Sequence, residues 1–392
     1  MESVKNNKKE ECCGCTACFS VCPTKAITMI KDEEGFLYPK VDENKCISCG
    51  KCKNICPLLK KNNFSEPLKY LAVKNKDCES RLSSSSGGMF SILVEYIKEK
   101  NGIVYGAIFD EDFVVYHKRI DPNIGDWEKI KGSKYVQSDL KNTFSEVKQD
   151  LMNGKVVLYT GTPCSISGLK KYLQNINTQN LITCDIVCHG VPSPKVWNDY
   201  LKYVSQKYNT QIGNIQFRNK EKVGWHNSTI KMYNKTNKAI LNEKQNENYY
   251  FLMFFNHLIL RPSCHACKYS NFNRPGDITL GDYWGIEKKH SKFDDDKGVS
   301  LVFINTEKGS FIWNSVKEKV EYIEIKQDEC AQPNLCSPSV KNSNREKFWK
   351  TYNKLGFVYT GKRFRIIKSG KMFKLIFLFD RIKRKIKNII VK

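Results

Sequence analysis

The residues with the clearest chemistry are cysteines that follow one spacing twice near the start of the chain. The pattern is C-x2-C-x2-C-x3-C, with a proline after each run. In this bacterial iron–sulfur pattern, the fourth cysteine of each run binds the other cluster. The spacing therefore predicts a first [4Fe-4S] cluster on Cys12, Cys15, Cys18 and Cys56. It predicts a second on Cys46, Cys49, Cys52 and Cys22.

Zinc sites and structural disulfides are the alternatives for these cysteines. Zinc would need four ligands per site and no interleaved prolines, so the proline after each run argues against it. The chain has 17 cysteines, an odd number that excludes complete pairing into disulfides. Residues 1–11 are polar and charged and do not resemble a secretory signal, so we expect a cytoplasmic protein with reduced thiols. Cys13 adjoins a predicted ligand and receives no role.

A third set of cysteines is scattered along the chain. Its members are Cys164, Cys188, Cys264 and Cys267. Four thiolates are what a third cubane needs. Buried free cysteines are common, however, and Cys184 competes as a ligand, so the residues alone leave this cluster open.

The elements that position the cysteines fall into two classes. Residues 26–41 read as a hairpin with its turn at 32–35, as in ferredoxin-like modules. Strands are predicted at residues 70–73, 102–109, 113–117, 155–159 and 181–187. Helices are predicted at residues 89–97, 140–152, 165–173 and 195–208. Strand–loop–helix repetition indicates a parallel sheet flanked by helices, with ligands in loops at the strand C-termini. Cys164 and Cys188 are placed in two such loops.

A serine- and glycine-rich segment at residues 83–88 precedes one predicted helix. Free backbone N–H groups, the helix dipole and serine hydroxyls would make a phosphate cradle there. A flexible linker or an ordinary helix cap is the alternative.

Composition and charge argue against two classes of protein, those that bind nucleic acids and those that span a membrane. The 392 residues carry a formal net charge of +24 and are 40% hydrophobic, which permits a sizeable core. The positive charge is spread along the chain without a helix-turn-helix or zinc-finger pattern, so we expect no nucleic-acid partner. No run of eighteen apolar residues predicts a membrane span. Residues 364–392 are basic, with isoleucines at helical spacing. Such a helix would lie on the inner face of an anionic membrane, or pack on the body or a partner subunit.

Several motifs in order resemble one family. Besides the paired cysteine runs they are residues 84–88, 131–136, 161–164, 188–192, 263–267 and 276–285. Together they are similar to the family formed by the beta subunits of coenzyme F-420 hydrogenases and dehydrogenases, which includes the 7-hydroxymethyl chlorophyll a reductases. The resemblance implies an FAD-containing iron–sulfur oxidoreductase. It also implies a third cluster on Cys164, Cys188, Cys264 and Cys267.

The resemblance further implies the FAD contacts. They are Ser84, Ser85, Ser86, Gly87, Gly88, Lys131, Ser133, Lys134, Thr162 and Pro163. Asp277 and Asp282 would orient ligands, shuttle protons, or serve only as turn carboxylates. The expected partners are a small-molecule hydride donor or acceptor and a redox protein such as ferredoxin. The alternative is a ferredoxin-like adaptor without its own substrate site, serving surface-polysaccharide biosynthesis.

The expected fold is an α+β ferredoxin-like N-terminal module followed by an α/β flavin-binding domain. Residues 1–62 would form the two-cluster module. Residues 68–335 would form the FAD domain, and residues 336–392 a helical basic extension.

Overall fold

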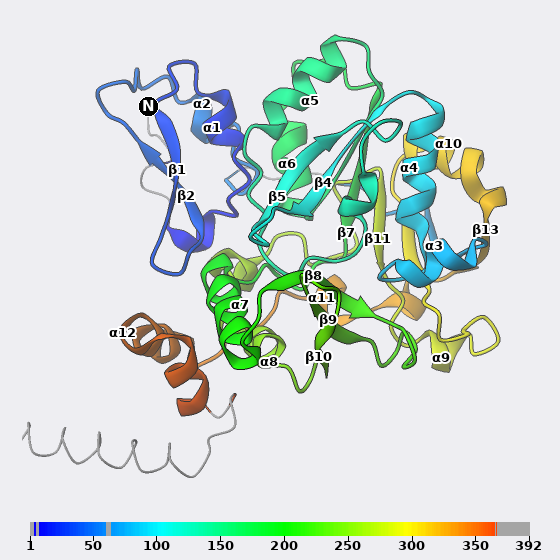
Figure 1. Ribbon diagram of the computed structural model, residues 1–392. Helices are drawn as coiled ribbons and strands as arrows, with labels where there is room; N and C mark the ends of the chain where they lie inside the picture. The colour runs from blue at the N-terminus through cyan, green and yellow to red at the C-terminus, as the bar shows by residue number, and fades with distance from the viewer. Residues whose placement is uncertain (1–3, 5–7, 60–63, 365, 367–392) are drawn as a thin grey trace, which may run out of the picture.

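The computed structural model describes residues 4, 8–59, 64–364 and 366 (Figure 1). Among these residues, no helix combines the length and apolar character needed to cross a membrane. The basic amphipathic helix expected near the C-terminus falls, apart from Phe364 and Ile366, outside the described residues.

The N-terminal segment forms a hairpin and two short helices. The elements are α1 (Ala17–Val21), β1 (Ile27–Lys31), β2 (Leu37–Val41) and α2 (Lys51–Asn54). Strands β1 and β2 pair antiparallel, as expected. The Asp32 carboxylate closes their turn by accepting the N–H groups of Glu34 and Phe36 at 3.1 and 2.9 Å. Figure 1 shows this segment in blue beside α5 and α6.

The body is built on one sheet of eight strands. Their order is β13 (Val320–Ile325), β3 (Lys69–Asn75), β12 (Ser300–Ile304), β11 (Ile278–Asp282), β7 (Leu181–Ile186), β6 (Val157–Gly161), β4 (Ile103–Phe109) and β5 (Val115–Ile120). Strands β4, β6, β7 and β11 are parallel. The other four pair antiparallel. The expectation of a parallel sheet is thus corrected to a mixed one: a short connection returns β5 antiparallel to β4, and at the other edge β3 pairs antiparallel with β12 and β13, which are distant in sequence.

Helices cover both faces of this sheet. Alternate residues of a strand point to opposite faces, so Val104 packs beneath α4 (Met89–Glu99) and α10 (Glu307–Val316). Tyr105 packs on the other face with α5 (Thr143–Met152) and α6 (Pro163–Tyr172). Cys15 and Ala17 of the N-terminal segment belong to this second core. The segment is therefore packed on the sheet domain rather than joined only by a linker.

A second layer of structure lies beyond the carboxyl ends of the parallel strands. It contains α7 (Pro194–Tyr208), which the sequence predicted, and α8 (Tyr249–Phe255). It also contains a sheet of β8 (Ile212–Asn219), β9 (Thr229–Asn234) and β10 (Ala239–Lys244), and the sequence patterns did not predict this sheet. Helix α12 (Arg345–Arg363) packs on α7, as Figure 1 shows. The remaining helices are α3 (Cys78–Ser83), α9 (Ile286–Lys289) and α11 (Pro333–Cys336).

Candidate iron–sulfur and flavin site

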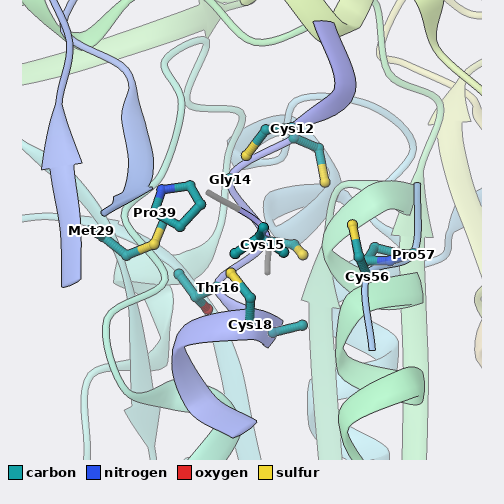
Figure 2. Close-up of a pocket in the computed structure, with 12 residues that line it drawn as sticks. Cys12, Gly14, Cys15, Thr16, Cys18, Met29, Pro39, Cys56 and Pro57 are labelled. Atoms are coloured by element: carbon teal, nitrogen blue, oxygen red, sulfur yellow. The ribbon is translucent and has the colours of Figure 1, made fainter. Parts of the chain in front are cut away.

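The first predicted cysteine group surrounds one pocket. Its walls include Cys12, Cys15, Cys18 and Cys56, the set predicted from the interleaved spacing (Figure 2). The chain turns between the cysteines through Gly14, which has a φ of +72°. A Cβ at Gly14 would meet the Arg261 guanidinium at 2.9 Å, so a larger residue does not fit. Cys56 reaches the pocket from the residues after α2.

The second predicted group lines a separate pocket. Its walls include Cys22, Cys46, Cys49 and Cys52, and all of its residues lie between positions 22 and 52. The N–H of Ala26 donates to the Cys22 sulfur at 3.3 Å. Although burial opposes the shift, this bond and one from Thr24 lower the pKa of Cys22 and favour the thiolate.

The donor chemistry of both pockets fits cubane clusters. Among the described residues, no group of three or more Cys, His, Asp or Glu is arranged to hold a single metal ion. In a [4Fe-4S] cluster each thiolate binds its own iron, so its ligand sulfurs stand farther apart than those around one zinc. All 17 cysteines are free thiols in the described structure. Four cysteines around each pocket are the donor set that a [4Fe-4S] cluster needs.

The third group also comes together, although its members are distant in sequence. Burial raises the pKa of the Cys188 thiol, and three neighbouring thiols add to the rise: Cys264, Cys164 and Cys267. Cys264 lies in the 3-10 helix Pro262–Ala266. Cys164 occupies the first turn of α6, which corrects its expected place in a loop. Proline is favoured at a helix start, so Pro163 begins the helix one residue earlier.

Cys184 does not belong to this group. It lies within β7, is 1% exposed and packs in the core beneath α4 and α10. Its thiol faces the carbonyl of Asp185 at 3.8 Å. Cys184, the alternative ligand for the third cluster, therefore lies apart from the four scattered cysteines.

Cys13 joins the first and third groups. Its thiol lies beside the thiols of Cys15 and Cys164, and each pair of neighbours affects the other's pKa. Helix α6 packs closely here, since a Cβ at Gly168 would lie 2.8 Å from the Cys15 sulfur. Sequence reasoning gave Cys13 no role, because its position between the groups depends on contacts between distant segments.

The serine- and glycine-rich loop sits at the edge of the sheet where the parallel strands end. A Cβ at Gly87 would meet the Val73 carbonyl oxygen at 2.2 Å, which requires glycine beside β3. The Ser84 and Ser86 hydroxyls donate to the Ser80 and Val299 carbonyls at 2.7 and 2.8 Å. Ser83 ends α3, while Gly88 precedes α4 without a side-chain cap.

The predicted lysine segment contacts this loop. The Ser133 N–H donates to the Ser85 hydroxyl at 2.8 Å, and Lys131 donates to Ser83 at 2.8 Å. Lys134 has a different role in the described structure. Its ammonium lies within 2.7–3.2 Å of four carbonyl oxygens of residues 129–132, and burial lowers its pKa to about 7. Lys134 therefore holds its own loop in shape.

Thr162 and Pro163 lie farther along the same edge. The strand order places three strand intervals between β12, beside the serine loop, and β6, which ends before Thr162. At about 4.8 Å per interval, this is roughly 14 Å. The Thr162 hydroxyl lies 3.3 Å from the Cys164 sulfur. Only an extended ligand would touch both segments, with its Thr162 end next to the third cysteine group.

Sequence reasoning missed Arg218 at this edge. Its side chain is 4% exposed and lies 3.7 Å from the Asp282 carboxylate and 4.8 Å from the Trp284 ring centre. Its Nε and Nη2 atoms are buried without a hydrogen-bond partner in the described structure. Lys220, two residues later on the chain, donates to the Ser86 carbonyl at 2.7 Å. A buried guanidinium with free donors is suited to an anionic ligand.

Asp277 and Asp282 serve different purposes. The Asp277 carboxylate accepts the Thr183 N–H and hydroxyl at 2.8 and 2.6 Å, within the sheet. These bonds are those of a structural carboxylate, which ties the start of β11 to β7. Asp282 ends β11 and accepts the Trp225 indole N–H at 3.3 Å.

Two family models match this chain. Residues 154–329 match the C terminus of the coenzyme F420 hydrogenase/dehydrogenase beta subunit, and residues 11–58 match the 4Fe-4S dicluster domain. These matches confirm the resemblance expected from the motifs.

Individual relatives are more distant. A component of the F(420)H(2) dehydrogenase of Methanosarcina mazei is 23% identical over 80% of this chain and 84% of its own length. An uncharacterized protein of Methanocaldococcus jannaschii is 27% identical over 45% of this chain and 58% of its own length. A chain of the F420-reducing [NiFe] hydrogenase complex from Methanosarcina barkeri aligns at 19% identity with a TM-score of 0.45, covering 68% of this chain and 86% of that one.

Proposed function

We propose that this chain is an FAD-dependent iron–sulfur oxidoreductase. Its residues 154–329 belong to the family defined by the C terminus of the coenzyme F420 hydrogenase/dehydrogenase beta subunit. Its 4Fe-4S dicluster domain and this family place it among proteins of oxidoreductase-type electron transfer. The observation that carries the proposal is the grouping of twelve cysteines into three sets of four, with the third set beside the carboxyl edge of the sheet. An organic hydride donor or acceptor would bind at this edge.

The three cysteine groups form a continuous row in this proposal. Cys13 lies between the third and first groups, beside Cys164 and Cys15. The first and second groups adjoin, because α1, which carries Cys18, packs against α2, which carries Cys52. Ile47, beside Cys46 of the second group, is 65% exposed. The second group is therefore the one we assign to contact with a redox protein partner.

FAD would occupy the carboxyl edge. When bound, it exchanges a hydride with an organic molecule and single electrons with an iron–sulfur cluster. The Ser85–Ser133 contact joins the two predicted FAD segments, and Arg218 supplies buried donors for a phosphate. Thr162 at the far end adjoins Cys164. These residues would hold an extended flavin nucleotide with one end near the third cluster.

The proposed cytoplasmic protein would reach the membrane only peripherally, through its basic tail. Flotation of the full chain with anionic vesicles tests this part separately. If the full chain and a form truncated before Met372 both stay in the soluble fraction, the membrane contact is wrong.

Anaerobic reduction tests the proposed activity. The purified chain would be mixed with NADH or a reduced deazaflavin while flavin absorbance and cluster EPR signals are followed. Loss of flavin absorbance together with the appearance of reduced-cluster signals supports the oxidoreductase. A chain with clusters, no flavin absorbance and no response to either donor would instead be a ferredoxin-like adaptor.

A further inference from the structure

Arg261 connects the body of the protein to the first cysteine group. Its side chain is fully buried, and it extends from the residue before the 3-10 helix Pro262–Ala266 into the N-terminal segment. Its Nε donates to the Cys12 carbonyl at 2.7 Å and its Nη2 to the Leu37 carbonyl at 2.9 Å. Nη2 also lies 3.6 Å from the Cys12 sulfur.

The charge of Arg261 has no carboxylate partner among the described residues. In contrast, the buried Arg274 pairs with Asp185, and the buried Arg345 pairs with Glu34. The other neighbours of Arg261 are neutral: the Gln137 amide oxygen at 2.9 Å and the Tyr38 ring, whose centre is 4.2 Å away. A buried charge is costly without a counter-charge. The Cys12 sulfur, with the first cluster it would bind, is the anionic group in contact with Arg261, and Cys264 of the third group also lies within the field of this charge.

We propose that Arg261 raises the reduction potential of the first cluster relative to the second. This inference rests on the proposed cluster ligands. Reduction by one electron adds one negative charge to a cluster, and a fixed positive charge nearby stabilises the reduced form more than the oxidised one. The effect is strong where burial excludes water. Arg261 is thus a positioning residue that acts through the first cluster.

The local structure fixes this charge in place. The Arg261 backbone N–H donates to the Val191 carbonyl at 3.0 Å, and its carbonyl accepts the Cys264 N–H at 2.9 Å. Both anchors belong to segments that carry the third cysteine group. Gly14 lies against the guanidinium, because its missing Cβ leaves the room that this group fills. Arg261 therefore links the third cysteine group to the first. An electron that passes between the body and the N-terminal segment would cross at this place.

Redox titrations of the full chain, purified anaerobically and monitored by EPR, test the inference. Arg261→Gln should lower the midpoint potential of one N-terminal cluster and leave the other at its wild-type value. Arg261→Lys should lower it less, because the shorter side chain keeps a charge farther from Cys12. Gln137→Ala is the matched control, since it removes a neutral partner of Arg261 without changing the charge. Cys18→Ser, which alters the signal of the first cluster, identifies which potential belongs to it.

The outcomes separate this inference from the proposed function. Absence of iron in the wild-type chain would refute the clusters themselves. Clusters present at unchanged potentials in Arg261→Gln would refute only the role of Arg261. Equal shifts in Gln137→Ala and Arg261→Gln would show a packing effect and also refute it. If Arg261→Gln does not retain iron, Arg261→Lys decides alone: a fall in the potential of the first cluster with the second unchanged supports the inference, and an unchanged first-cluster potential overturns it.

Discussion

Glu34 and Arg345 form a buried ion pair that ties the N-terminal hairpin turn to the start of α12. Arg345 Nη1 donates to Glu34 Oε1 at 2.9 Å, and its Nη2 donates to the second carboxylate oxygen and to the Leu260 carbonyl. The Arg345 and Glu34 side chains are 7% and 9% exposed, and the two residues are 311 positions apart in the sequence. The pair joins three segments that meet only in the folded protein.

We expect Arg345→Gln to destabilise the protein strongly. Removing one partner of a buried ion pair leaves an uncompensated charge and typically costs about 3–5 kcal/mol. Lys341→Gln is the control, because its pair with Glu346 is exposed and worth at most about 1 kcal/mol. Thermal unfolding of the anaerobic protein should show a large fall in Tm for Arg345→Gln only. Similar, small shifts in both variants would contradict a stabilising role for the pair.

The ligand set of the third cluster predicts selective iron loss. Cys264→Ala should remove about four iron atoms per chain, the content of one cubane. Cys184→Ala and Cys13→Ser should keep all of the iron, because Cys184 packs in the core and Cys13 lies between the groups without belonging to either. Iron analysis after anaerobic purification checks this. Full iron content in Cys264→Ala would refute the ligand set.

Arg218 is predicted to hold flavin without affecting iron. Arg218→Gln removes the buried positive charge whose Nε and Nη2 make no hydrogen bond in the described structure, and we expect its flavin content to fall several-fold. Lys231→Gln changes a charge on the adjacent strand that is already paired with Glu221, and it should keep its flavin. Flavin released by denaturation measures the content. Unchanged flavin in Arg218→Gln would show that the anion binds elsewhere.

The burial of His117 predicts that the free energy of unfolding decreases in mild acid. Burial lowers its pKa to about 4, from an ordinary value of 6.5. Its Nε2 lies 2.9 Å from the Thr160 carbonyl and its Nδ1 2.7 Å from the Ser138 hydroxyl, which suits a neutral ring. As pH falls from 6.5 towards 4, the unfolded chain binds a proton that the folded one excludes, so the unfolding free energy decreases. His117→Gln should show a shallower decrease in denaturant titrations across this range. An identical slope would contradict the burial of a neutral His117.

The parts of this structure that sequence predicts are those set by local spacing. Three residues or fewer separate neighbouring cysteines within each run, so the two pockets follow from the pattern and from the crossing of the fourth cysteine. The turn at Asp32 is similarly local, because its carboxylate caps the N–H groups two and four residues later.

The missed parts depend on contacts between distant segments. Arg261 lies 249 positions from Cys12, and no local pattern distinguishes it from the other basic residues. The same holds for Arg218, which becomes a candidate site residue only because the fold places it beside Asp282 at the end of β11. The antiparallel edges of the sheet also depend on which strands become neighbours in the fold, which hydrophobic runs do not specify.

The central claim is that one chain holds three clusters and a flavin. Iron and flavin analysis of the anaerobically purified wild-type protein tests it most directly. The account predicts about twelve iron atoms per chain, four for each cubane, together with about one FAD. About eight iron atoms and no flavin would contradict it, and would leave the two N-terminal clusters as a ferredoxin-like carrier.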